Sequence, residues 1–324
     1  MKAVLCTEAG PPEKLKLADL PDPLPGKSEV VVDVAAAALN FFDTLMIMGR
    51  YQSKPEYPFS PAAEFSGTIS AVGEAVNGFK VGDKVCGYCG HGAAREKVVI
   101  STDRLVLVPS DLDLDRAAGL FVTYGTTIHA LQDRARIRPG ETLAVLGAAG
   151  GTGLAAIELG KLLGAKVIAC ASSAEKLEFC RKHGADEVID YSKDDLKERL
   201  RELTAGKGAD VIYDPVGGKF AEPALRSTAW DGRYLVIGFA AGEIPKIPLN
   251  LPLLKGFEIV GVFWGEFIRR HPDRLRVQIK NLLQWVKEGK VSAHVDESFP
   301  FRRAVDAFKA METRKVMGKV LLKP

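Results

Sequence analysis

The sequence predicts an α/β protein with two domains: a doubly wound parallel sheet and a mostly antiparallel β domain. From Glu141 onward, short apolar strands alternate with helical segments, which is typical of a parallel sheet covered by helices. A glycine-rich turn lies directly between the first of these strands and the first helix. Before Phe121, by contrast, strand-like segments follow one another between Pro and Gly residues.

Size and composition support two domains without disulfides. The chain has 324 residues, and domains usually contain about 100–200. Its 44 basic and 41 acidic residues give a net charge of +3, which indicates neither a nucleic-acid nor a membrane partner. The five cysteines are few and odd in number, which favours reduced thiols. With no secretory apolar core and no apolar run of about 20 residues, the sequence predicts a cytoplasmic protein.

The first domain is predicted from short β-branched segments that end at glycines or polar turns. The predicted strands are Val30–Leu39, Phe65–Gly73, Val81–Tyr88 and Arg95–Ser101. We expect them to form an antiparallel, mostly β unit.

The second domain is predicted from the strand–helix alternation, and its crossovers should be right-handed. The predicted strands are Thr142–Gly147, Ala165–Ala171, Glu187–Tyr191, Asp210–Gly217, Arg233–Phe239 and Glu258–Trp264. The predicted helices are Gly151–Leu163, Ala174–His183, Asp194–Thr204 and Phe220–Ala229.

The C-terminal segment should return to the first domain. It contains a predicted helix at Pro272–Glu288, an amphipathic helix at Phe301–Thr313 and a final strand at Gly318–Leu322. The parallel sheet would then be inserted between the two pieces of the β domain. We predict a β domain of residues 1–121 and 264–324 and a Rossmann domain of residues 122–263.

The turn GAAGGTG (Gly147–Gly153) is predicted to bind a pyrophosphate. Glycine lets the backbone approach the anion without a clashing Cβ atom. The helix that begins near Gly151 directs free N–H groups and its positive dipole end toward the same place, and Gly153 allows helix and strand to pack closely. We therefore expect Gly150, Gly151, Thr152 and Gly153 to contact the cofactor. A glycine-rich turn without a ligand is the less favoured alternative.

The end of the second strand favours NADPH. NAD sites usually carry Asp or Glu about 20 residues beyond the glycine motif, but here the chain reads Ala171-Ser172-Ser173. Ser172, Ser173 and Lys176 could donate hydrogen bonds to a 2′-phosphate, and Lys176 adds positive charge. Alternatively, one serine caps the following helix and Lys176 is solvated, an arrangement that is compatible with phosphate binding.

Several motifs, in order along essentially the whole chain, resemble the medium-chain dehydrogenase/reductase superfamily, and within it the NADPH:quinone oxidoreductase, zeta-crystallin-like branch. The motifs are NFFDTLMIMGRY (Asn40–Tyr51), AAEFSGTISAVGEAV (Ala62–Val76), VTYGTTIHAL (Val122–Leu131), GAAGGTG, ASSAEK (Ala171–Lys176), YDPVGG (Tyr213–Gly218), VIGFAAGEIP (Val236–Pro245), NLPLLK with GVFWG (Asn250–Gly265) and GKVLL (Gly318–Leu322).

This resemblance implies a GroES-like β domain, a Rossmann domain, an active site in the cleft between them, and a homodimer that pairs edge strands of its Rossmann sheets. It places Tyr191 near the adenine ribose, Asn40 and Thr123 near the nicotinamide, and Phe263 and Trp264 at the substrate rim. Gly238 and Phe239 would line the cofactor cleft after the fifth strand.

The residues at the superfamily's catalytic zinc position predict no metal. Where zinc-dependent alcohol dehydrogenases have His-Glu, this chain has Ala63-Glu64, and the upstream cysteine position falls in Leu39–Phe41, which has no thiol. Catalytic zinc needs three protein ligands. Glu64 is expected to be a structural ion-pair residue. Cys86 and Cys89, with His91 nearby, could be half of a structural zinc site or a redox pair, but plain thiols are favoured.

The resemblance implies hydride transfer from NADPH to a quinone without zinc. Asn40 is a candidate donor to the developing oxyanion, and Tyr51 is a candidate proton donor, since related enoyl reductases place a tyrosine there. A packed loop aromatic is an equal alternative for Tyr51. Phe41, with Phe263 and Trp264, would give the planar substrate an apolar wall.

Two other functions remain open. The same cofactor and site could reduce activated C=C bonds in enones, 2-substituted acrylates or enoyl thioesters. A protein that binds NADPH but has a structural or RNA-binding role is the second alternative, although the chain has no basic stripe that would favour nucleic acid.

Overall fold

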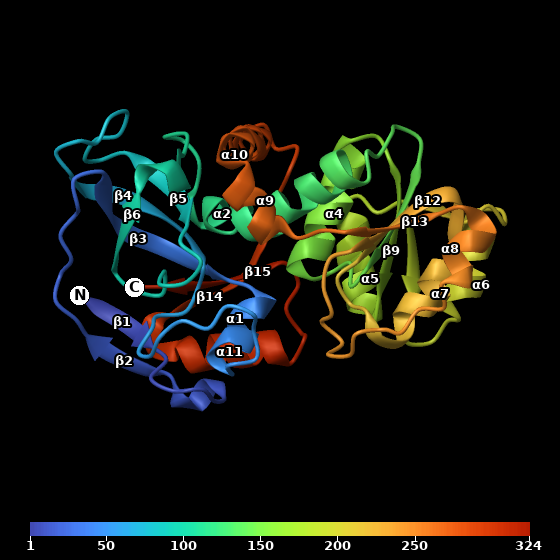
Figure 1. Cartoon of the computed structure of the whole chain (residues 1–324), viewed down its shortest axis with the longest axis horizontal. Coiled ribbons are helices and arrows are strands. Elements are labelled where there is room, and N and C mark those ends of the chain that lie inside the picture. Colours follow the sequence, from blue (N-terminus) through green and yellow to red (C-terminus); the bar gives the residue numbers. More distant parts are fainter. The chain divides into compact units, whose positions relative to one another are not determined.

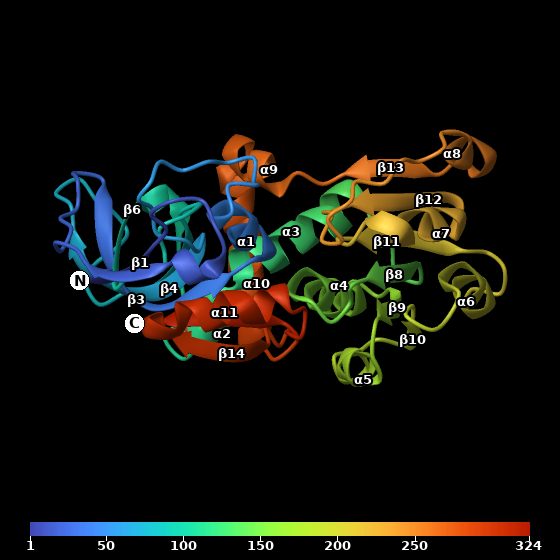
Figure 2. The ribbon, with the colours of Figure 1, turned by 90° about the horizontal axis from the view of Figure 1, so that it is seen from below.

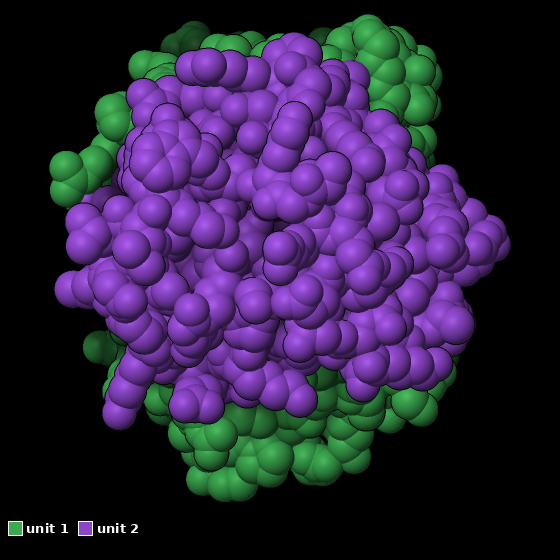
Figure 3. Space-filling view, turned by 90° about the vertical axis from the view of Figure 1, so that its right-hand side faces the viewer, with its two compact units in different colours: residues 1–123, 268–324 green, residues 124–267 purple.

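The computed structural model describes all residues, Met1–Pro324 (Figure 1). The chain forms two compact units, coloured separately in Figure 3. Unit 1 contains Met1–Thr123 and Ile268–Pro324, and unit 2 contains Tyr124–Phe267. These divisions lie two and four residues beyond the predicted domain limits at 121 and 263.

Unit 1 is built around a seven-stranded sheet with the order β14-β15-β3-β4-β5-β7, in which β6 also pairs with β3. All of these pairs are antiparallel except β14 with β15. The strands are β3 (Glu29–Leu39), β4 (Glu64–Val72), β5 (Lys84–Tyr88), β6 (Lys97–Ser101), β7 (Leu105–Leu107), β14 (Val295–Pro300) and β15 (Lys319–Lys323). The C-terminal strand therefore does return to the β domain, beside β3.

The remaining elements of unit 1 cover this sheet and its ends. A separate two-stranded sheet pairs β1 (Lys2–Leu5) with β2 (Lys16–Asp19). The helices are α1 (Phe41–Ile47), α2 (Leu114–Ala118), α10 (Pro272–Lys287) and α11 (Ala304–Glu312). Alternating apolar residues of β3 and β4, such as Val30, Val32 and Phe65, join Phe308 of α11 in the buried core.

Unit 2 is a six-stranded parallel sheet with the order β10-β9-β8-β11-β12-β13, the classical dinucleotide-binding order. The strands are β8 (Thr142–Leu146), β9 (Lys166–Ala171), β10 (Glu187–Asp190), β11 (Ala209–Asp214), β12 (Thr228–Val236) and β13 (Glu258–Gly261). The inner strands β8, β9 and β11 are almost entirely buried, as their unbroken apolar composition requires.

Helices cover both faces of this sheet. Figure 2 shows α4 (Gly151–Leu162) on one side of the strands and α6 (Leu196–Leu203) and α7 (Ala221–Arg226) on the other. The other helices of this half are α3 (Gly125–Ile128), α5 (Ala174–Lys182) and α8 (Asn250–Lys255), and α9 (Trp264–Arg270) runs across the division between the units. No helix of the structure combines the length and apolar character that crossing a membrane would require.

Candidate functional site

The loops predicted to hold the cofactor all follow the carboxyl ends of parallel strands in unit 2. Parallel strands end at one edge of their sheet, so these loops gather there. The order of the strands reverses between β8 and β11, which is where doubly wound sheets bind their ligands. The GAAGGTG turn follows β8, one of these two strands.

The β8–α4 turn has the geometry of a phosphate-binding loop. Gly147 has φ +58°, a conformation that disfavours other residues. A Cβ atom on Gly153 would lie 2.3 Å from the carbonyl oxygen of Gly147, so only glycine fits there. Helix α4 begins after Gly150, which has no side chain to cap it, and the first-turn N–H groups have no acceptor within the helix. These groups fit a dinucleotide pyrophosphate.

The next loop contains the residues proposed for the 2′-phosphate. Ser173 is the N-cap of α5, and its hydroxyl oxygen accepts a hydrogen bond from the backbone N–H of Lys176 at 3.4 Å. The capping alternative is therefore correct for Ser173. Ser172 is exposed and Lys176 is partly exposed, so both side chains remain within reach of solvent at the carboxyl end of β9. No acidic residue occupies this loop.

The loops after β10, β11 and β12 pack against one another. The ring of Tyr191 lies 4.4 Å from that of Phe220, and its backbone N–H donates to the carbonyl of Ala171 at the end of β9. Asp214 fixes the turn after β11 by accepting from the N–H groups of Val216 at 2.7 Å and Gly217 at 2.9 Å. These bonds shape the surface that a cofactor would meet.

Gly238 and Phe239 follow β12 and lie against this same turn. The side chain of Phe239 leaves no room for a Cβ atom on Gly217, which would come within 2.9 Å of its ring. Beyond β13, Phe263 is 63% exposed, whereas Trp264 is only 6% exposed. The Trp264 indole nitrogen lies 3.1 Å from where a Cβ atom of Gly125 would be. Their roles toward cofactor and substrate stay predictions.

Unit 1 contains a fully bonded buried centre formed by Lys319, Glu64 and Asn40. The ammonium of Lys319 donates to Glu64 Oε1 at 2.9 Å, to Asn40 Oδ1 at 2.8 Å and to the carbonyl of Leu39 at 2.9 Å. Asn40 Nδ2 also donates to Glu64 Oε1 at 2.9 Å, and the Val122 N–H donates to Glu64 Oε2 at 2.9 Å. Glu64 thus forms the ion pair that the sequence predicts for it, and Lys319 is its partner.

Strand pairing brings this centre together. Glu64 begins β4 opposite Ala38 of β3, and Val320 of β15 lies opposite Leu39. The stem of Lys319 packs on Gly119, where a Cβ atom would come within 2.8 Å of it. Removing one member of such a buried ion pair typically costs about 3–5 kcal/mol.

The donor set does not fit zinc. Of the residues at the zinc position, only Glu64 is a metal-ligand type, and Lys319 and Asn40 already bind one of its oxygens while the Val122 N–H binds the other. No group of three or more His, Cys, Asp or Glu side chains in the protein could hold a metal ion.

Asp43, in the first turn of α1, is a buried carboxyl beside this centre. It is 0% exposed, and its Oδ2 accepts from the backbone N–H of Asn40 at 2.7 Å while its Oδ1 has no partner. Burial raises its pKa to about 7, and the charge of Glu64 adds to this, against the Asn40 bond and the charge of Lys319. Asp43 thus exchanges a proton near neutral pH.

The other predicted residues of unit 1 surround α1. Phe41 is exposed at the first position of the helix, and Tyr51 stacks on Phe42 with ring centroids 5.2 Å apart. Burial, followed by the charge of Asp43, raises the pKa of Tyr51, so its hydroxyl is protonated at neutral pH. Thr123 is buried, and its hydroxyl donates to the carbonyl of Gly119 at 2.8 Å.

The CxxC cysteines are free thiols, one buried and one partly buried. Cys86 is fully buried in β5, and Cys89 Sγ lies 3.4 Å from the carbonyl of Ala63. Burial raises the pKa of Cys86, and it raises that of Cys89 to about 12. Thiols with such pKa values are poor nucleophiles at neutral pH.

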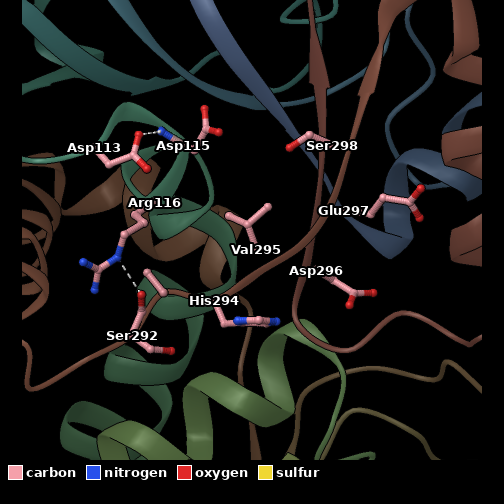
Figure 4. Close-up of a pocket in the computed structure, with 10 residues that line it drawn as sticks. Asp113, Asp115, Arg116, Ser292, His294, Val295, Asp296, Glu297 and Ser298 are labelled. Atoms are coloured by element: carbon pink, nitrogen blue, oxygen red, sulfur yellow. Dashed lines mark hydrogen bonds between the residues drawn. The ribbon is translucent and has the colours of Figure 1, made fainter.

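A hollow in unit 1, of about 410 Å³, contains none of the predicted site residues. Figure 4 shows acidic side chains around it, among them Asp113 and Asp296, and the guanidinium of Arg116 directed at Ser292. Arg116 donates to the carbonyls of Ser292 at 2.8 Å and Val291 at 3.0 Å, and so fastens α2 to the segment before β14. This arrangement is structural.

Lys319 of the buried centre and its neighbour Asp43 are not among the residues predicted from the sequence. Lys319 stands within the GKVLL motif, and nothing local indicates that its ammonium is buried beside Glu64. Asp43 had a recognisable signal: it stands three residues after Asn40, the capping-box spacing at a helix start.

Replacing Asp43 by Asn should make stability less dependent on pH. The folded pKa is about 7, above the value near 3.9 of an unfolded aspartate, so the folded state binds more protons and wild-type stability falls as pH rises through this window. The unfolding free energy of Asp43→Asn minus that of wild type should therefore grow by about 1–3 kcal/mol between pH 5 and pH 8 in urea titrations.

The matched control is Asp103→Asn, which changes an exposed carboxylate of unit 1 and should show no such trend. A difference for Asp43→Asn that stays flat from pH 5 to pH 8 would mean that this carboxyl is ionised throughout.

Comparisons with known proteins agree with this architecture. The chain matches the family descriptions "Alcohol dehydrogenase GroES-like domain" over residues 26–110 and "Zinc-binding dehydrogenase" over residues 151–288. It is 39% identical to a quinone oxidoreductase-like protein 2 homolog of Nematostella vectensis over 99% of this chain and 88% of that one.

Two solved structures are similar over nearly the whole chain. The Escherichia coli quinone oxidoreductase complexed with NADPH has a TM-score of 0.93 and 29% identity, with full coverage of both chains. The CurK enoyl reductase has a TM-score of 0.87 and 28% identity, covering 99% of this chain and 98% of the other. Together with the sequence matches, these likenesses confirm the GroES-like and Rossmann architecture. The chain belongs to the quinone oxidoreductase family of the medium-chain dehydrogenase/reductases and is an oxidoreductase.

Proposed function

We propose that the protein is a zinc-independent reductase that uses NADPH to reduce quinones. The observation that carries the proposal is the engagement of Glu64 and Asn40 by the Lys319 ammonium. Ala63 and Leu39–Phe41 supply no Cys or His, and this engagement occupies the one carboxylate at the zinc position, so the metal-bound alkoxide route of alcohol oxidation has no ligand set. The relative complexed with NADPH supports the choice of cofactor.

NADPH, when bound, supplies a hydride. The first turn of α4 would hold its pyrophosphate, and Ser172, Ser173 and Lys176 its 2′-phosphate. Reduction leaves an oxyanion on the substrate that needs a hydrogen-bond donor and then a proton. One Nδ2 hydrogen of Asn40 is free to donate, since the other bonds Glu64. The protonated hydroxyl of Tyr51 is the proposed proton donor.

Reduction of activated C=C bonds is the second candidate. The structural likeness to an enoyl reductase supports it, and an enolate has the same need for a donor and a proton as a quinol anion. Initial rates of NADPH oxidation with 1,4-benzoquinone, 9,10-phenanthrenequinone, 2-cyclohexenone and crotonyl-CoA would separate the two. Turnover of the quinones well above that of the alkenes is expected, and the reverse order would favour the second candidate.

Lys176→Glu should raise the KM for NADPH by about ten-fold or more and leave the KM for NADH nearly unchanged, because a carboxylate would face the 2′-phosphate. Lys182→Glu is the matched control, since it makes the same charge change at the exposed end of the same helix. Steady-state kinetics with both nucleotides measure the effect. An equal rise for NADPH and NADH would show that Lys176 does not contact the 2′-phosphate.

Tyr51→Phe should lower kcat by about 100-fold at neutral pH without changing the KM for NADPH, since the variant keeps the ring that stacks on Phe42 and loses only the proton donor. Tyr57→Phe removes the hydroxyl of an exposed tyrosine in the same loop and should be silent. An undiminished kcat in Tyr51→Phe would assign the proton to another group.

We also propose a homodimer that pairs two copies of β13. This strand is an unpaired edge of the parallel sheet and exposes Ile259, and the preceding segment exposes the large side chains of Leu249, Leu253 and Leu254. Light scattering should give twice the 35.0 kDa chain mass, and Ile259→Lys should give a monomer. A monomeric wild-type protein would exclude this pairing.

A further inference from the structure

Arg95 is a partly buried cation without an anion. No carboxylate of the protein lies within ion-pair distance of its guanidinium, and its buried Nε has no hydrogen-bond partner. Burial lowers the pKa of Arg95, yet a guanidinium stays charged at physiological pH. Such a charge is costly to desolvate, and charges that are buried usually have a partner.

The loop that presents Arg95 is pinned beside the buried centre. The N–H of Cys89 donates to the carbonyl of Ala63 at 2.8 Å, and that of Ala93 donates to the carbonyl of Ala62 at 3.0 Å. Ala63 directly precedes Glu64. Gly92 has φ +103°, and a Cβ atom built on it would lie 3.6 Å from Nη2 of Arg95. The guanidinium therefore packs next to this glycine. Backbone hydrogen bonds thus fix the loop on both sides of Gly92.

The same loop lies next to the residues proposed for catalysis. The thiol of Cys89 is within electrostatic range of both Arg95 and Asp43. The hydroxyl of Tyr88 is likewise within range of Tyr51, Asp43 and Cys89. Tyr88 ends β5 opposite Glu64, so the loop that carries Arg95 leaves the sheet beside the buried centre.

The imidazole of His91 lies near Arg95. His91 is exposed and packs on Phe59 edge to face, with ring centroids 5.9 Å apart. Partial burial, followed by the charge of Arg95, lowers the pKa of His91, so the imidazole is neutral at physiological pH. A neutral imidazole can donate one N–H to an anion beside Arg95 without adding a competing charge.

We propose that Arg95, with His91 beside it, is an anion subsite that selects acceptors bearing a carboxylate on the conjugated system. The planar guanidinium fork matches a carboxylate in two parallel hydrogen bonds. A flat acceptor would place its apolar part toward the aromatic residues around Tyr51 and its carboxylate at the fork. This inference rests on the proposed reductase function.

The test compares wild type with Arg95→Met, using NADPH oxidation with 1,4-naphthoquinone and 2-carboxy-1,4-naphthoquinone. Arg95→Met should raise the KM for the carboxylated quinone by about ten-fold or more and leave the neutral quinone within about two-fold, because only the former loses a charge-assisted pair. Arg95→Lys should recover much of the loss. Arg104→Met removes an exposed cation also within range of Cys89 and should change neither substrate.

Calorimetric titration with 2-naphthoate tests the anion subsite independently of the proposed quinone reduction. This carboxylate has a similar shape, and its binding needs no turnover, so Arg95→Met should weaken it about ten-fold even if quinones are not reduced. Equal effects of Arg95→Met on both quinones, or unchanged 2-naphthoate affinity in a variant with wild-type thermal stability, would overturn the anion subsite. Absence of quinone reduction by wild type would overturn only the proposed function.

Discussion

The ammonium of Lys319 determines how the buried end of the β domain is organised. Its three hydrogens are used by Glu64, Asn40 and the carbonyl of Leu39, so it connects the ends of three neighbouring strands. Without it, the Glu64 carboxylate would be an uncompensated charge at 0% exposure, which folded proteins rarely tolerate. The same contact orients the Asn40 amide, since only one orientation lets its oxygen face the ammonium and its nitrogen face the carboxylate.

This centre also explains the properties of its neighbours. Asn40 uses its side chain on Glu64 and Lys319, so the start of α1 is capped from the other direction, by Asp43 accepting the Asn40 backbone N–H. Asp43 is thereby drawn into the interior with one oxygen unbonded, and burial raises its pKa. Burial is also the main cause that raises the pKa of Tyr51, and the charge of Asp43 adds to it.

Much of the fold could be predicted because its local signals agree with its tertiary structure. The β8-turn-α4 unit combines an apolar strand, a glycine turn and a helix start, and its predicted bounds differ from the observed ones by one residue. The failures lie where tertiary contacts decide. Strand β14 reads VDESFP, with polar and mostly exposed residues, and forms only because β15 offers a partner. Helix α1 has seven residues, too few to be stable alone.

The candidate site likewise has one part that the sequence predicts and one part that only tertiary contacts reveal. The loops of unit 2 are predictable because the carboxyl ends of parallel strands must share an edge, whatever the loops contain. The contacts of Lys319 cannot be predicted in this way, because its two side-chain partners precede it in the sequence by 255 and 279 positions. Arg95 and Asp43 stand out because each has a buried polar atom without a hydrogen-bond partner, Nε and Oδ1 respectively. A sequence does not show which polar atoms lack partners.

In the zinc-independent reductase that we propose, a lysine–glutamate pair stands where related dehydrogenases hold a catalytic metal. The most direct measurement is NADPH-dependent reduction of 1,4-benzoquinone by protein exhaustively dialysed against a chelator, with bound metal quantified by mass spectrometry on the same sample. The account predicts unchanged kcat at a metal content far below one ion per chain. Loss of activity on chelation, with recovery on adding back zinc, would contradict it.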